Sequence, residues 1–233
     1  MKVNIKGPII SNSEAWIYEW FGIEATSPNS VNKVLEKANG EDIEVEINSG
    51  GGSVFAGSEI YTALKSYSGN VTVKIVGLAA SAASVIAMAG NKVMMSPTAQ
   101  IMIHNVSSRA SGDYRDMEHT AEVLRNANDT IANAYRIKTG KTQEKLLALM
   151  DHETWMTAEK AKELGFIDEI MFENDLQLVA STDFSGMLPP EVINKIRNTI
   201  KNPLNSQNEE NETDILMAKF NYLKLKGDVK HEL

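Results

Sequence analysis

The most regular hydrophobic pattern of the chain is an alternation of apolar and charged residues over 43–47. This alternation predicts a strand with one buried face. A glycine-rich turn over 48–52 follows, and apolar residues at helical spacing then predict a helix over 54–67. Valine and isoleucine residues over 71–76 predict a second strand, which is expected to end at Gly77.

The next segments continue this order of strands and helices. Small residues over 79–89 favour a helix, which Gly90 and Asn91 are expected to end. Short apolar runs at 93–95 and 101–103 predict two further strands. Strands that alternate with helices are typical of βαβ crossovers, so we predict an α/β fold around a mostly parallel sheet.

Four more helices are predicted outside this region. They are expected over 30–38, with Ser30 as its cap, and over 113–136, 142–150 and 157–164. The segment 113–136 is dense in charge and low in large apolar residues. Such a helix buries little of itself in its own domain, so it is expected to project or to pack against another subunit.

The chain changes character after about residue 175. We therefore divide it into a main domain over 1–175, a helical extension over 176–201, a polar linker over 202–213 and a candidate amphipathic helix over 214–233. The linker is almost wholly polar, which is typical of a flexible segment.

Composition and charge exclude several classes of partner and chemistry. A formal net charge of -8 argues against nucleic acid or an anionic membrane as the main partner. The chain has no cysteine, which excludes disulfides, a cysteine nucleophile and thiolate–metal sites and is compatible with a reducing cytoplasm. The apolar segment 75–91 is short for a membrane span and rich in small residues, so a strand–turn–helix explains it better.

The N-terminus lacks a basic segment followed by an apolar core, so we expect no signal peptide and a cytoplasmic location. Neither a metal site nor an organic cofactor is indicated, because only one histidine occupies a site-like position. That residue is His104, which follows the apolar run 101–103 at the carboxyl end of a predicted strand, where α/β sheets bind their ligands. The other three, His119, His152 and His231, lie in polar segments and are expected to be solvated. On position alone, a structural histidine is the commoner explanation of His104.

Ser81 is the candidate nucleophile. It lies after the strand that ends at Gly77, at the predicted start of the next helix. There its hydroxyl would lie near unpaired N–H groups and the positive end of a helix dipole, which favour developing negative charge. Alanines hold the glycine positions of the G-x-S-x-G elbow, so that motif is absent. Ser84 is a rival that lies deeper in the helix and is expected to be packed, and a serine at a helix start is also commonly just a cap.

The glycine turn over 47–53 is the third candidate element. It fails the dinucleotide-binding fingerprint because Phe55 occupies the third glycine position, and no Lys-Ser/Thr pair follows as a P-loop requires. What remains is a turn after a strand that can present backbone N–H groups closely to a ligand.

Taken in order, these elements resemble the Clp protease proteolytic subunit (ClpP) family. That family carries I-N-S-P-G-G, then G-x-A-A-S with the nucleophile, then M-I-H with the base. The corresponding segments here are 47–52, 77–81 and 102–104, and residues 155–168 are similar to the segment after the family's acid. The resemblance covers roughly residues 40–170. It implies a ClpP/crotonase-like fold of βαβ units with a protruding helix and assembly into stacked rings.

The resemblance also implies roles for individual residues. Ser81 would attack the peptide carbonyl and His104 would act as general base, giving a serine endopeptidase that works through an acyl-enzyme. The backbone amides of Gly52 and Ala82 would form the oxyanion hole. The substrate would be a polypeptide.

Two residues depart from the family pattern. Gly50 replaces the family's proline in the glycine turn. Glu153 stands where the family has its catalytic aspartate, and a glutamate can orient the histidine equally well. Asp151, two residues earlier, is the alternative acid.

Other details are similar to the phage and prophage branch of the family, among them residues 54–57, 80–90 and 153–155 and the long C-terminal extension. They imply a protease of the host cytoplasm that matures the prohead without an obligatory ATPase, with a capsid or scaffold protein as substrate. The extension would serve assembly or be trimmed by the enzyme itself. One alternative is a housekeeping-type Clp peptidase that works with an ATPase unfoldase. Another is a non-proteolytic crotonase-fold protein that binds acyl-CoA, and a third is a catalytically inactive assembly protein.

Overall fold

The structure of the chain is a computed structural model that describes residues 1–173. The segments expected over 176–201, 202–213 and 214–233 lie outside the described residues. The described part is built around one sheet of seven strands. The predicted α/β fold is confirmed, and every strand pair but one is parallel.

The strands are β1 (Lys2–Lys6), β2 (Ile43–Ser49), β3 (Val71–Ala80), β4 (Lys92–Met95), β5 (Gln100–Ile103), β6 (Thr154–Met156) and β7 (Glu169–Ile170). The helices are α1 (Ala15–Trp20), α2 (Pro28–Ala38), α3 (Val54–Lys65), α4 (Ala82–Ala87), α5 (Tyr114–Thr139), α6 (Gln143–Asp151) and α7 (Ala158–Glu163). None of these helices has the length and apolar composition needed to cross a membrane.

The sheet forks at β3. The strand order β1-β2-β3-β4-β7 forms the main path, while β5 pairs with β3 and β6 pairs with β5. The first half of β3, Thr72–Ile75, pairs with β4, and its last three residues, Leu78–Ala80, pair with β5. The β5–β6 pair is the antiparallel one. β3 therefore connects the main sheet to the strand that carries His104 at its end.

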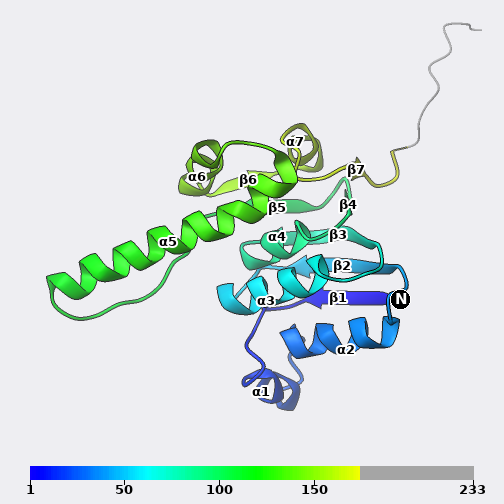
Figure 1. Cartoon of the computed structure of the whole chain (residues 1–233), viewed down its shortest axis with the longest axis horizontal. Coiled ribbons are helices and arrows are strands. Elements are labelled where there is room, and N and C mark those ends of the chain that lie inside the picture. The colour runs from blue at the N-terminus through cyan, green and yellow to red at the C-terminus, as the bar shows by residue number, and fades with distance from the viewer. Residues whose placement is uncertain (174–233) are drawn as a thin grey trace, which may run out of the picture. The chain divides into compact units, whose positions relative to one another are not determined.

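The alternating apolar and charged residues of β2 point to opposite faces of the sheet, and the apolar ones are buried. They lie in register with the buried apolar residues of β3, as in the pair Val45 and Val73. Helices α3 and α4 cover the sheet on one side (Figure 1). Glu44 on the charged side forms an ion pair with Lys74 of β3. On the charged side of β2, a cross-strand ion pair rather than apolar packing therefore links β2 to β3.

Helix α5 projects from the sheet, as Figure 1 shows. Of its 26 residues only Ala132, Ala134 and Tyr135 are buried, all near its C-terminal end. Gly140 ends the helix in the left-handed conformation. The prediction that this helix would bury little of itself is confirmed.

Two predicted boundaries were wrong. Strand β3 continues to Ala80, so the helix expected from residue 79 begins at Ala82. Hydrogen bonding of Leu78–Ala80 to β5 outweighs the helical propensity of these alanines. The cap of α2 is Ser27, whereas Ser30 lies at the third helical position and completes a reciprocal capping box.

Four short elements were not predicted: β1, α1, β6 and β7. Strands β6 and β7 have three and two residues, too few for a periodic pattern to register. Helix α1 has no buried residue, so its sequence carries no amphipathic signal.

Candidate active site

The candidate site lies at the carboxyl ends of three neighbouring strands. In the parallel register Ser49 of β2 is opposite Ala79 of β3, and Ala80 is opposite Met102 of β5. The residues that follow these strands therefore meet at one edge of the sheet, the usual position of ligand sites in α/β folds. They are the glycine turn, Ser81 and His104.

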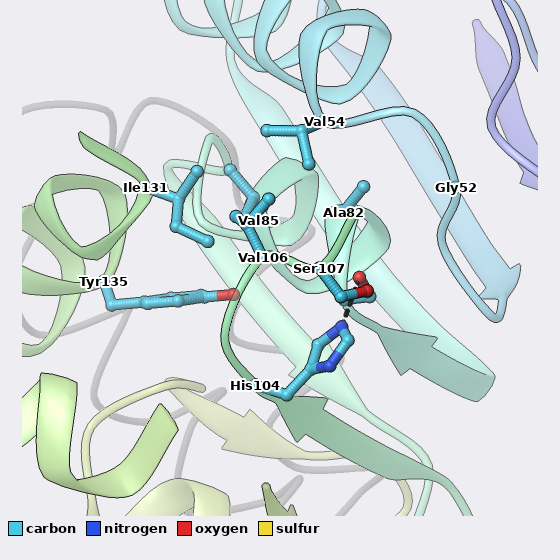
Figure 2. A pocket seen from close by; sticks show the side chains of 10 residues that line it. Gly52, Val54, Ala82, Val85, His104, Val106, Ser107, Ile131 and Tyr135 are labelled. Carbon is cyan, nitrogen blue, oxygen red and sulfur yellow. Dashed lines mark hydrogen bonds between the residues drawn. The ribbon is translucent and has the colours of Figure 1, made fainter. Parts of the chain in front are cut away.

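Ser81 and His104 are in direct contact. The Ser81 Oγ and His104 Nε2 atoms are 2.8 Å apart, and the ring of His104 points across the pocket in Figure 2. A hydroxyl that donates to Nε2 requires the ring proton on Nδ1. Among the described residues, the imidazole makes no hydrogen bond besides this one.

The backbone of Ser81 adopts a conformation that residues with a side chain rarely have, with φ 55° and ψ -125°. Its N–H donates to the Met102 carbonyl at 3.0 Å, which ties it to β5. Ser81 precedes α4 as its N-cap, yet its hydroxyl does not cap that helix. The hydroxyl is consequently available to His104 rather than to the backbone.

The glycine turn packs directly on Ser81. Gly51 has φ +93°, and a Cβ at this position would lie 2.6 Å from the Ala80 carbonyl oxygen and 2.7 Å from Ser81 Cβ. Gly52 makes a similar approach to Ile9, whose carbonyl oxygen would lie 2.2 Å from an added Cβ. A Cβ on Gly50 would meet nothing within 4 Å. Two of the three glycines are therefore required by close packing, and the one that replaces the family's proline is not.

Two residues before these glycines position the turn, although the sequence did not single them out. The Asn48 side chain accepts a hydrogen bond from Leu78 N–H at 3.1 Å, beside the register shift between Ile47 and Ser49. The Ser49 hydroxyl donates to the Gly7 carbonyl at 2.6 Å and accepts from Gly51 N–H at 3.1 Å. These contacts fix the turn against β1 and β3.

The amides of Gly52 and Ala82 have no acceptor among the described residues. Ala82 is the first residue of α4, where backbone N–H groups have no intrahelical partner. Both residues line the same pocket as Ser81 and His104. Their N–H groups are thus unpaired donors beside the hydroxyl, as an oxyanion hole requires.

The remaining pocket wall is mostly apolar. It is formed by Val54, Val85, Val106, Ile131 and the ring of Tyr135, together with Ser107 (Figure 2). These residues come from α3, α4, the segment after β5 and α5. An apolar side chain of a bound ligand would fit against this wall.

Ser84 lies behind this wall, next to the hydroxyl of Tyr135. Ser84 is buried, and its hydroxyl donates to the Ser81 carbonyl at 2.6 Å and lies 2.8 Å from the Tyr135 hydroxyl. Burial raises the pKa of Tyr135 well above its ordinary value. Because the Ser84 hydroxyl is buried and already bonded, it is not exposed to a substrate.

Neither candidate acid is bonded to His104. The antiparallel pairing of β5 with β6 ends at Ile103 and Thr154, and His104 and Glu153 are the adjacent residues of the two segments. The Glu153 carboxylate, however, accepts a hydrogen bond from the Trp155 indole N–H at 3.2 Å. Asp151 accepts one from the Asn105 side chain at 2.7 Å. The structure therefore brings Ser81 and His104 together and leaves both carboxylates engaged elsewhere.

The other histidines lie apart from this pocket or outside the described part. His119 and His152 are exposed, on α5 and at the end of α6. His231 lies outside the described residues.

Comparison with known proteins identifies relatives of this chain. A family model described as Clp protease matches residues 26–174, more than half of the chain. The ATP-dependent Clp protease proteolytic subunit of Bacteroides fragilis is 38% identical over 58% of this chain and 66% of its own length. Proteolytic subunit 1 of Chlamydia abortus is 37% identical over 61% of this chain and 77% of its own. Proteolytic subunit 1 of Chlamydia muridarum is 35% identical over 71% of this chain and 83% of its own length.

We predict that Gly51→Ala will destabilise the protein while Gly50→Ala will not. A residue held at a positive φ costs about 1–3 kcal/mol, and the clash with Ser81 adds to this. An alanine at residue 50 has open space, so its effect should stay within about 0.5 kcal/mol. Chemical denaturation of both variants measures the difference. Equal stability of the two would contradict the packing described for the turn.

Proposed function

The chain belongs to the Clp protease family of serine peptidases, and on that premise we propose that it hydrolyses peptide bonds with Ser81 as nucleophile and His104 as general base. The 2.8 Å contact between Ser81 Oγ and His104 Nε2 carries this proposal. The chain covers 66% and 62% of the length of two Bacteroides relatives. Activity, substrate and partner are therefore all parts of the proposal.

The reaction would follow from the contacts in the pocket. The Ser81 hydroxyl gives its proton to His104 Nε2 as its oxygen attacks the peptide carbonyl. The amides of Gly52 and Ala82 donate to the oxyanion that forms, each donor contributing about 2.7–4 kcal/mol. His104 then protonates the leaving amine, and water hydrolyses the acyl-enzyme by the same route.

The pocket also favours a class of cleavage site. Its wall is formed largely by valine and isoleucine side chains next to Ser81. An apolar residue beside the scissile bond would bury the apolar wall on binding, which is favourable. A charged residue at the same place would lose its hydration without gaining a partner, which is unfavourable.

We propose Glu153 as the group that orients His104 in the catalytically competent state. His104 follows and Glu153 precedes the last β5–β6 pair, Ile103 with Thr154. Among the described residues the Glu153 carboxylate makes one exposed hydrogen bond, to Trp155. Asp151 is the weaker candidate because Asn105 already binds it at 2.7 Å. Rotation of the Glu153 side chain away from Trp155 would precede its bonding to His104 Nδ1.

The relatives favour a peptidase that works with an ATPase. Those compared above are named ATP-dependent proteolytic subunits, which supports the second of the partner hypotheses from the sequence. The capsid-maturation hypothesis rests on sequence details and on a C-terminal extension that lies outside the described residues, and none of these relatives is a phage protein. Assembly into stacked rings is part of the same proposal.

An acyl-CoA-binding protein of the crotonase fold is the alternative from another class. It would also use backbone amides to bind an oxyanion, but it has no need of a hydroxyl–imidazole pair. The contact between Ser81 and His104 therefore favours the peptidase.

A fluorophosphonate probe is expected to label the wild-type chain at Ser81. Ser81→Ala should abolish labelling, and His104→Ala should slow it by roughly 10³-fold or more, because the hydroxyl loses its base. Mass spectrometry of the labelled peptide identifies the site. Ser84→Ala is not a suitable control because that residue contacts Ser81, so Ser58→Ala on the exposed side of α3 serves instead. Labelling of Ser81→Ala would refute the assignment by showing that another residue is the nucleophile. No labelling of the wild type would refute it in favour of a catalytically inactive assembly protein.

Exchanging each carboxylate for its amide separates the two candidate acids. Glu153→Gln is expected to lower kcat for a short apolar peptide by about 10²–10⁴-fold, because an amide cannot stabilise the imidazolium. Asp151→Asn should change kcat far less, and Trp155→Phe should not lower it because it frees Glu153. A larger loss in Asp151→Asn than in Glu153→Gln would reverse the assignment.

ATP dependence distinguishes the two partner hypotheses. With a purified Clp-type ATPase, cleavage of a folded protein substrate should require ATP hydrolysis, while short peptides are cleaved without it. A non-hydrolysable ATP analogue is the control. Equal cleavage of the folded protein with and without the ATPase would favour the ATP-independent hypothesis.

A further inference from the structure

We propose that Tyr135 and Ser84 are positioning residues for the nucleophile, and that they hold the main chain of Ser81 through two consecutive hydrogen bonds. The inference deepens the proposed function, on which it rests. Tyr135 belongs to α5 and Ser84 to α4, 51 residues apart in sequence. Neither Tyr135 nor Ser84 forms a hydrogen bond with His104.

The direction of the two hydrogen bonds follows from the number of protons available. The Ser84 hydroxyl has one proton and lies 2.6 Å from the Ser81 carbonyl oxygen, which can only accept. Ser84 therefore donates to Ser81. The Tyr135 hydroxyl, 2.8 Å from Ser84 Oγ, must then donate its own proton to Ser84.

Because both hydroxyls are buried, the hydrogen bonds of Tyr135 and Ser84 can support the main chain of Ser81 but do not contact a substrate. Tyr135 and Ser84 are both 0% exposed, so their hydroxyls do not reach a bound ligand, although the Tyr135 ring forms part of the pocket wall. Burial also raises the pKa of Tyr135, which keeps the phenol protonated as a donor. In a buried site each hydroxyl needs its partner, because an unpaired one loses its hydration without compensation.

The main chain of Ser81 requires such support. Its φ of 55° and ψ of -125° are unfavourable for a residue with a side chain, and conformations of this kind persist only where neighbouring contacts impose them. The Ser81 carbonyl accepts from the Ser84 hydroxyl and from the amides of Ser84 and Val85. Its N–H is held by Met102. Among the three donors to the Ser81 carbonyl, the Ser84 hydroxyl also bonds to α5, through the Tyr135 hydroxyl.

The pair therefore couples α5 to the nucleophile. Only the C-terminal end of α5 is buried, and Tyr135 lies in that end. A movement of this helix that separates Tyr135 from Ser84 would loosen the carbonyl of Ser81 and, with it, the direction of the Ser81 hydroxyl. The ring of Tyr135 also packs against Phe166, so the hydroxyl must be tested without removing the ring.

Three variants of the full chain test this inference: Tyr135→Phe, Ser84→Ala and the two combined. Tyr61→Phe is the matched control, since this half-buried tyrosine has no hydrogen-bond partner for its hydroxyl among the described residues. The rate constant kinact and the binding constant KI for a fluorophosphonate probe are measured for each, with thermal unfolding as a test of folding. Hydrogen–deuterium exchange of residues 82–88 supplies a readout that does not depend on activity.

We expect kinact to fall by about 3–10-fold in Tyr135→Phe, the value of one hydrogen bond, with KI unchanged. The double variant should be no slower than the slower single variant, because both remove the same arrangement. Ser84→Ala leaves the Tyr135 hydroxyl buried and unpaired, so adding Tyr135→Phe should raise its unfolding temperature. Exchange over 82–88 should be faster in all three variants and unchanged in Tyr61→Phe.

The inference and the proposed function fail in different ways. If the wild type is labelled and the variants keep its kinact, the positioning role is overturned and the peptidase assignment is not. A rise in KI alone also overturns it, since Tyr135 would then shape only the pocket. If the wild type is never labelled, the proposed function fails, and the exchange data decide about the support of Ser81: faster exchange in Tyr135→Phe upholds it, and unchanged exchange refutes it.

Discussion

Parallel hydrogen bonding along β3 is the interaction on which the candidate site depends. One neighbour, β2, delivers the glycine turn to the end of β3, and the other, β5, delivers His104. Parallel strands end at the same edge of a sheet, so the glycine turn, Ser81 and His104 converge although Gly52 precedes Ser81 by 29 residues and Ser81 precedes His104 by 23. The N–H of Ser81, bonded to Met102, extends this ladder by one residue into the site itself.

The close approach of backbone to backbone is what the glycine turn contributes. Gly51 lies against Ser81 and Gly52 against Ile9, at distances that a Cβ would not permit. The turn thereby lies between Ile9, which follows β1, and Ser81 at the start of α4. The amides of Gly52 and Ala82 have no acceptor among the described residues and lie at the pocket. Asn48 and Ser49 hold it there through their side chains. The three glycines and the two polar residues before them thus act as one structural unit, with Gly50 as the position that tolerates change.

Much of the fold could be predicted from the sequence, because alternation marks β2, helical spacing marks α3, and a long charge-rich segment marks most of α5. The extension of β3 to Ala80 could not, since pairing with β5 outweighs the local preference of two alanines for helix. The order of motifs predicted Ser81 and His104, and the structure has them in contact, while their catalytic roles stay a prediction. The pairing of Ser84 with Tyr135 has no local signal, since two hydroxyls far apart in sequence meet only in the folded chain. The acid also stays a prediction, because side-chain rotation, which no sequence pattern reports, decides whether Glu153 reaches His104.

The fork in β3 has a consequence for how this chain can vary over evolution. Residues 72–75 pair with β4 and residues 78–80 pair with β5, so the number of residues between Ile75 and Ser81 fixes the spacing between the two branches of the sheet. Adding or losing one of them would turn every later side chain to the opposite face and carry the serine away from the imidazole. Residues 108–112 after β5 are all exposed and have no comparable restriction. Insertions and deletions should therefore be tolerated in the exposed segment near the pocket and selected against in β3.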